Sequence, residues 1–243
     1  MFSLFKKEIS RFFSTLTAYV VILVFLLINS LYMWVFPGEL NILDAGYATI
    51  DTLFIISPWV FLFLIPAITM RMFAEEKKSG TLDLLLTRPL NDFQIILAKY
   101  SAALTLVIFS LIPCLVYFLT VYLMGNPPGN IDTGGTWGSF IGLFFLAAAY
   151  TGFGIFSSSI TDNMIISFII AACISFLFFI GFDYVIQLKI FGRAATFILD
   201  LGIYEHYKSI SRGVIYLKDI IYFVSIVAVF LLFTRTILNK RRW

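Results

Sequence analysis

Long apolar runs alternate with short polar segments along the whole chain. A run of about 20 mostly apolar residues is long enough to cross a bilayer as a helix. Six runs reach this length and predict membrane-spanning helices at residues 16–36, 52–70, 94–124, 137–159, 164–187 and 220–238. The third run is longer than a bilayer requires. We therefore expect it to tilt, to extend beyond the membrane or to bend at Pro113.

Residues 1–15 have a different pattern, in which apolar side chains recur at spacings of three and four. These apolar positions are Phe2, Phe5, Ile9, Phe12 and Leu16. Lys6, Lys7 and Arg11 fall between them. The spacing predicts a basic amphipathic helix in the membrane interface. It serves either as a simple anchor or as an elbow that leads into the first span.

Composition restricts the class of protein. Of the 243 residues, 60% are hydrophobic and only 13% are charged. Soluble domains have about 25% charged residues, and a water-soluble globule could not hide this much apolar surface. A soluble enzyme, a nucleic-acid-binding domain and a disordered chain are therefore excluded. The sequence predicts an all-α polytopic membrane protein with a single domain, residues 1–243, and no nucleic-acid partner.

The distribution of positive charge predicts the orientation. Most of the 17 Lys and Arg residues lie before the first span, between spans two and three, or after the last span. The loops 37–51 and 125–136 have none. Because cytoplasmic loops carry an excess of Lys and Arg, both termini are expected in the cytoplasm. Five cations depart from this pattern and lie in the outer loop 188–219: Lys189, Arg193, Lys208, Arg212 and Lys218.

The cytoplasmic segment 71–93 carries the most specific pattern. Gly80 allows a backbone reversal with positive φ. Thr81 can then N-cap a short helix, which Pro89 ends. Asn91 and Gln94 form a capping-box pair for the next helix.

Leucines crowd this short helix at positions 82, 84, 85 and 86. We expect these leucines to be exposed at the cytoplasmic face, where they need a partner surface. The partner is either the lipid headgroup layer or a groove on a soluble protein.

The same segment resembles the hallmark of ABC-2-type transporter permeases. The matching residues are Glu76, Gly80, Thr81, Leu82, Leu85, Pro89 and Lys99. The turn at 157–163, the six spans and the long last outer loop are also similar to that family. Within it, the chain most closely resembles the gliding-motility-associated permease subunits of Bacteroidota. The nitrous-oxide-reductase maturation permeases are the next most similar group.

This resemblance implies a permease in the bacterial inner membrane that is built from two such chains, identical or homologous. Two separate ABC ATPase subunits would hold ATP and Mg, since this chain has no phosphate-binding loop and is not itself an enzyme. The segment 71–93 would then contain the coupling helix. The residues expected to dock or couple the ATPase are Glu75, Glu76, Gly80, Thr81, Leu82, Leu85, Leu86, Pro89 and Lys99.

The outer segment 188–219 is too apolar for a solvated loop and too short to span, which predicts re-entrant half-helices. Asp183 is the clearest intramembrane acid and therefore a candidate functional residue. We group it with Glu205, His206 and Arg212 as a candidate outer gate. A lone histidine cannot complete a zinc site, so a structural role is favoured for His206.

Two other functions stay open on the sequence alone. The chain could be a membrane scaffold that uses the same docking helix for a partner other than an ATPase. An ion-coupled secondary transporter is disfavoured, because charged residues near the middle of the spans are nearly absent and no inverted repeat is visible. The sequence does not identify a transported substrate.

Overall fold

The computed structural model describes residues 1–86, 91–187 and 199–240. Within these ranges all regular structure is helical. Six helical stretches are long and apolar enough to cross a membrane: Leu16–Val35, Asp51–Lys78, Asp92–Met124, Thr133–Ile160, Met164–Ile186 and Leu217–Asn239. The prediction of an all-α chain with six spans is confirmed.

Several of these spans are built from more than one helix. The elements in chain order are α1 (Phe2–Ser14), α2 (Leu16–Ser30), η1 (Leu31–Val35), α3 (Ile42–Ala45), α4 (Asp51–Thr69), α5 (Arg71–Lys78), α6 (Thr81–Leu86), α7 (Asp92–Leu111), α8 (Cys114–Met124), α9 (Thr133–Ile160), α10 (Met164–Phe176), η2 (Leu177–Gly181), α11 (Phe182–Gln187), α13 (Ile203–Ser211) and α14 (Leu217–Asn239).

The third span breaks between α7 and α8. The sequence allowed this long run to tilt, to extend beyond the membrane or to bend at Pro113, and the structure shows a break at Pro113. The reason is that proline has no backbone N–H to donate to the preceding turn. At the start of α7, Asn91 and Gln94 form the expected capping box.

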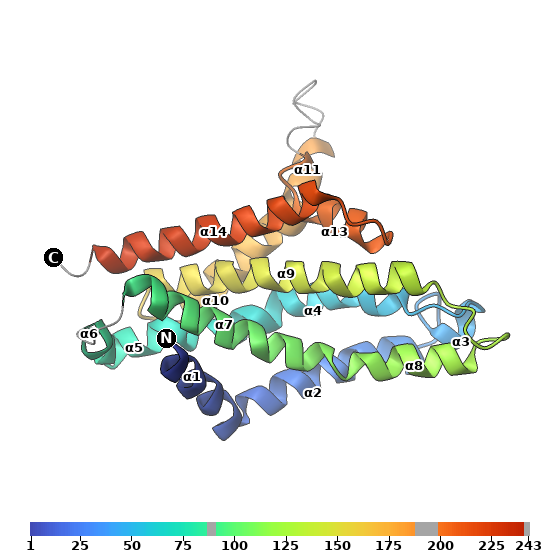
Figure 1. Cartoon of the computed structure of the whole chain (residues 1–243), viewed down its shortest axis with the longest axis horizontal. Coiled ribbons are helices and arrows are strands. Elements are labelled where there is room, and N and C mark those ends of the chain that lie inside the picture. Colours follow the sequence, from blue (N-terminus) through green and yellow to red (C-terminus); the bar gives the residue numbers. More distant parts are fainter. Residues whose placement is uncertain (87–90, 188–198, 241–243) are drawn as a thin grey trace.

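Helix α9 lies at the centre of the bundle (Figure 1). In its most apolar window 78% of residues are buried, against 22% in α14. It packs against α4, α7, α10, α13 and α14. Glycine allows a close approach of α9 to the end of α13: a Cβ at Gly138 would lie 2.6 Å from the carbonyl oxygen of Ile210 and 2.8 Å from Cα of Gly213.

Both ends of the chain lie at the same end of the bundle, together with α5 and α6 (Figure 1). The short helix α3 and the end of α8 lie at the opposite end. An even number of spans brings the two termini to the same end. Two polar regions lie apart in the bundle, one near α5 and one near α13.

Candidate functional site

Lys99, on the second turn of α7, is a charged residue with no exposed surface. Its ammonium donates to three oxygens: Oε1 of Glu8 at 2.9 Å, Oε1 of Glu76 at 2.8 Å and the carbonyl oxygen of Met72 at 2.8 Å. An ammonium has three donors, so all of them are satisfied. The ring of Phe73 lies 5.3 Å from the nitrogen.

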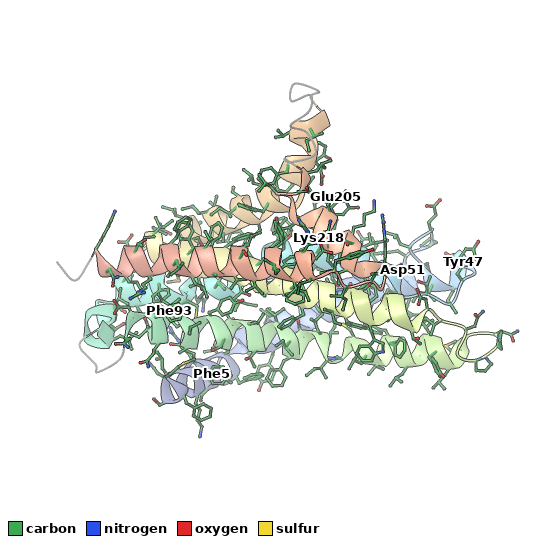
Figure 2. All side chains as sticks on the ribbon, turned by 45° about the horizontal axis from the view of Figure 1, so that its top comes forward. Phe5, Tyr47, Asp51, Phe93, Glu205 and Lys218 are labelled. Carbon is green, nitrogen blue, oxygen red and sulfur yellow. The ribbon has the colours of Figure 1, made fainter. Side chains whose placement is uncertain are left out.

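The partners of Lys99 come from three separate helices. Glu8 lies on α1, Met72 and Glu76 on α5, and Lys99 on α7. We call Glu8, Glu76 and Lys99 the buried charge cluster. It fastens the N-terminal helix and α5 to the start of the third span, at the end of the bundle where Figure 2 labels Phe5 and Phe93.

The buried charge cluster has one more carboxylate than cation. Oε2 of Glu76 is buried and has no hydrogen-bond partner among the described residues. One turn outward, Arg11 and Glu75 form a half-exposed ion pair at 2.8 Å, again between α1 and α5. Removing one member of a buried charge pair is strongly destabilising, because it leaves an uncompensated charge. The cluster therefore holds α1, α5 and α7 together as one unit.

A second polar contact lies where α4 gives way to α5. The hydroxyl of Ser158, on α9, accepts from the backbone N–H of Phe73 at 2.9 Å and of Ala74 at 3.0 Å, and donates to the carbonyl of Met70 at 3.1 Å. The side chain of Lys77 also donates to the carbonyl of Ser159. Ser158 thus satisfies backbone groups that the helix break would leave unpaired.

The turn between α5 and α6 agrees with the sequence prediction at Gly80 and departs from it at Leu82 and Leu85. Gly80 has φ +69°, the left-handed conformation expected of it. The expectation of exposed leucines is wrong for Leu82 and Leu85, which are 1% and 7% exposed. The reason is that α6 folds back onto α5, so these two leucines join the core of this chain.

What the turn does expose is polar. Lys78, Ser79, Gly80 and Thr81 are all exposed at the end of the bundle. Leu86 is helical but its side chain lies outside the described part, as does all of Pro89. A partner that approaches this end would meet these four residues rather than Leu82 and Leu85.

Among the predicted docking residues, Glu76 and Lys99 are in direct contact in the structure, and Glu75 lies beside them. It adds Glu8, which sequence reasoning missed. Glu8 is 2% exposed and lies one turn after the buried Leu4. It is the only acid among the first 15 residues. A single acid within a basic amphipathic helix was the available signal.

The residues grouped as an outer gate are only partly together. Glu205, His206 and Arg212 line one cavity of about 310 Å³ beside α13, whereas Asp183 lies on α11 and does not line it. Residues 188–198 of the predicted re-entrant segment lie outside the described residues. The part of the segment that is described forms α13, packed on α9.

His206 is held on both sides of its ring. Its Nδ1 lies 2.7 Å from Oδ1 of Asp219, and its Nε2 lies 2.9 Å from the carbonyl oxygen of Asp200. The other oxygen of Asp219 accepts from Ser209 at 2.8 Å. The ring of Tyr222 stacks on His206 with 3.8 Å between centroids. These contacts join α13 to α14, in agreement with a structural role.

Tyr207 joins α13 to another helix. Its hydroxyl donates to the carbonyl of Phe54, on α4, at 2.7 Å. Burial raises the pKa of the Tyr207 phenol well above its usual value. Because the phenol stays protonated, it remains a hydrogen-bond donor at every physiological pH.

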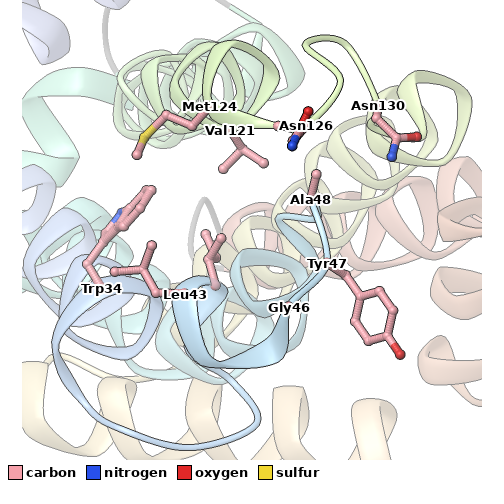
Figure 3. Close-up of a pocket in the computed structure, with 11 residues that line it drawn as sticks. Trp34, Leu43, Gly46, Tyr47, Ala48, Val121, Met124, Asn126 and Asn130 are labelled. Carbon is pink, nitrogen blue, oxygen red and sulfur yellow. The ribbon is translucent and has the colours of Figure 1, made fainter.

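A separate cavity of about 510 Å³ opens at the far end of the bundle between α3 and α8. Trp34, Leu43, Val121 and Met124 line it, and Figure 3 shows the Tyr47 ring turned away from its centre. Its lining has no charged side chain.

The chain was compared with models of protein families. A family model described as "ABC-2 family transporter protein" matches residues 6–183, which is well over half of the chain. The matched part begins within α1 and includes α5, α6, α7 and α9. A search of curated proteins found no match.

Proposed function

Because the chain belongs to the ABC-2 family of transporter proteins, we propose that it is the membrane-spanning permease subunit of an ATP-driven transporter. A separate ABC ATPase would bind ATP and Mg at the cytoplasmic face. Two permease chains, identical or homologous, would pair with two ATPase subunits in the bacterial inner membrane. Both termini would then be cytoplasmic.

The buried charge cluster supports a coupling role for the α5–α6 region. An ATPase that moves the exposed turn at 78–81 would move α5, since the turn continues directly from it. Glu76 and Lys99 transmit that displacement to α7, and Glu8 transmits it to α1. Coupling also requires the ATPase to contact the turn differently in its two nucleotide states. A partner that binds two conformations of the permease equally well cannot shift the equilibrium between them.

The test is to solubilise the tagged chain from its native membrane and identify what co-purifies. We expect an ATPase with a phosphate-binding loop, and magnesium-dependent ATP hydrolysis in the eluate. Thr81→Arg places a bulky cation on the exposed turn and should remove the ATPase without unfolding the chain. Lys7→Glu, at an exposed site on α1, is the control and should retain it.

Recovery of the chain without an ATPase, under conditions in which a known ABC complex survives, would favour the scaffold function instead. An ATPase that is retained by Thr81→Arg would show that docking occurs elsewhere.

Within the family, we propose a role in gliding-motility machinery on the resemblance of the overall sequence pattern. Deleting the gene should abolish surface spreading of the source organism and leave nitrous-oxide reduction intact. The reverse result would assign the chain to reductase maturation.

A further inference from the structure

The loop between α13 and α14 has an unusual surface. Four successive apolar side chains are between 41% and 71% exposed, and a cation stands at each end. The run is Arg212, Gly213, Val214, Ile215, Tyr216, Leu217 and Lys218. Exposed apolar residues between two cations are typical of segments that enter a lipid headgroup layer. The proposed permease function leaves this loop without a role.

The depth of the loop agrees with such a location. A Cβ at Gly138 would lie 2.8 Å from Cα of Gly213, so the loop lies at the level of the adjacent Trp137. Trp137 is 52% exposed, and exposed tryptophans concentrate at the border between membrane and water. Helix α14, a membrane span, begins at Leu217. The loop therefore lies at this border, near the end of the bundle that is remote from α6.

Beside the loop lies the cavity of about 310 Å³ that Lys208, Arg212 and Lys218 share. In the described part of the chain none of these three cations forms a salt bridge. Buried Asp219 also lines the cavity, but its two oxygens contact His206 and Ser209 rather than any of these cations.

The remaining acids of the lining, Asp200 and Glu205, are exposed. Figure 2 shows Glu205 and Lys218 in this region of α13 and α14. With Asp219, Asp200 and Glu205 give the lining three acids against its three cations, so the cavity has no net formal charge. The exposed carboxylates of Asp200 and Glu205 are screened by water and salt.

The site is held in place before any ligand binds. His206 and Asp219 join α13 to α14 on either side of the loop, and the hydroxyl of Tyr222 donates to the carbonyl of Leu201 at 2.5 Å. The backbone at Arg212 and at Lys218 is therefore held at the two ends of one short connection. A preorganised site loses less conformational freedom when it binds.

We propose that this cavity binds the phosphate of an anionic phospholipid headgroup, with Arg212 and Lys218 on the phosphate and residues 214–217 among the acyl chains. That the lipid belongs to the outer leaflet rests on the orientation in the proposed function. The proposal gives a role to Arg212 and Lys218, two of the five Lys and Arg residues that occur in this outer loop against the usual preference for the cytoplasmic side.

The experiment uses the complex as it purifies, placed in nanodiscs of phosphatidylcholine with a minor fraction of phosphatidylglycerol. The enrichment of phosphatidylglycerol that remains on the protein after exchange into detergent is measured by mass spectrometry. Each cation near an anionic membrane surface contributes about fivefold to partitioning. The Arg212→Gln/Lys218→Gln variant should thus lose enrichment by roughly 25-fold.

Three variants make the result specific. Lys6→Gln/Lys7→Gln removes the same charge from exposed positions on α1, outside the cavity, and should lose less enrichment than Arg212→Gln/Lys218→Gln. Arg212→Lys/Lys218→Arg should also keep it, which separates loss of the site from misfolding. Glu205→Gln should raise it, because it removes an opposing charge from the lining.

Three results would count against the proposal. Unchanged enrichment in the double Gln variant, or an equal loss in the α1 variant, overturns the proposal. Displacement of the lipid by millimolar inorganic phosphate would show a site for free anions and overturns the lipid assignment. The readout requires no ATPase, so a failed result here is distinct from failure of the proposed function.

Discussion

Replacing Lys99 with methionine tests the buried charge cluster most directly. The substitution keeps an unbranched apolar stem and removes three hydrogen bonds, two of them to carboxylates. It also leaves Glu8 and Glu76 buried without a cation. Breaking a buried charge pair by removing one partner costs about 3–5 kcal/mol. We expect a loss of stability in that range.

A change of this size is readily measured. For a chain of 150–250 residues, 1 kcal/mol corresponds to about 2–4 °C in Tm, so Lys99→Met should lower Tm by roughly 6–20 °C. The assay is thermal unfolding of the purified complex in one detergent. Lys7→Met is the matched control, because Lys7 is exposed on α1, and it should change stability by less than about 0.5 kcal/mol.

Removing the stranded carboxylate charges should rescue Lys99→Met. Adding Glu8→Gln and Glu76→Gln to Lys99→Met removes both stranded charges and should recover most of the lost stability, since a neutral replacement of a buried ion pair is often tolerated. Glu8→Gln alone should cost less than Lys99→Met, because the cluster has one carboxylate in excess. A Lys99→Met protein as stable as the wild type, or a triple variant no better than the single one, would refute this account.

Three further predictions follow from close contacts. Gly138→Ala forces a methyl group against two backbone atoms and should cost about 1–3 kcal/mol in thermal unfolding, whereas Gly134→Ala meets only ordinary contact and should be nearly neutral. Ser158→Ala removes the hydroxyl that accepts from the N–H groups of Phe73 and Ala74 and should cost about 1–3 kcal/mol by the same assay, with hydrogen exchange increased at Phe73 and Ala74. Leu85→Asp should reduce the yield of folded chain, since this side chain is buried, and size-exclusion chromatography would show aggregation; a monodisperse Leu85→Asp protein would contradict the packing of α6.

The sequence was sufficient for features that depend on local pattern. Apolar run length identified the six spans, and residue type identified the turn at Gly80 and the cap at Asn91. It could not place Glu8, Glu76 and Lys99 together, because they are separated by 23 to 91 residues and come from three helices. An isolated Lys near the start of a span looks the same whether it reaches the interface or is fully buried.

The error at Leu82 and Leu85 has the same origin. Amphipathic spacing shows that a short helix has an apolar face, and it does not show what covers that face. The turn at Gly80 reverses the chain, and this allows α6 to bury its leucines against α5 rather than present them to a partner. The available surface is consequently the turn itself.

The strengths of the contacts around α5 indicate where this region can bend. The buried charge cluster would cost several kcal/mol to separate, so α1, α5 and α7 are expected to move as one body. Ser158 makes three neutral hydrogen bonds at the break by Met70, and each contributes only about 0.5–1.5 kcal/mol net. A hydroxyl can also exchange one backbone partner for another at little cost. Displacement of the α5–α6 turn should therefore be absorbed at Met70 and Ser158, where α4 meets α5 and α9, rather than at Lys99.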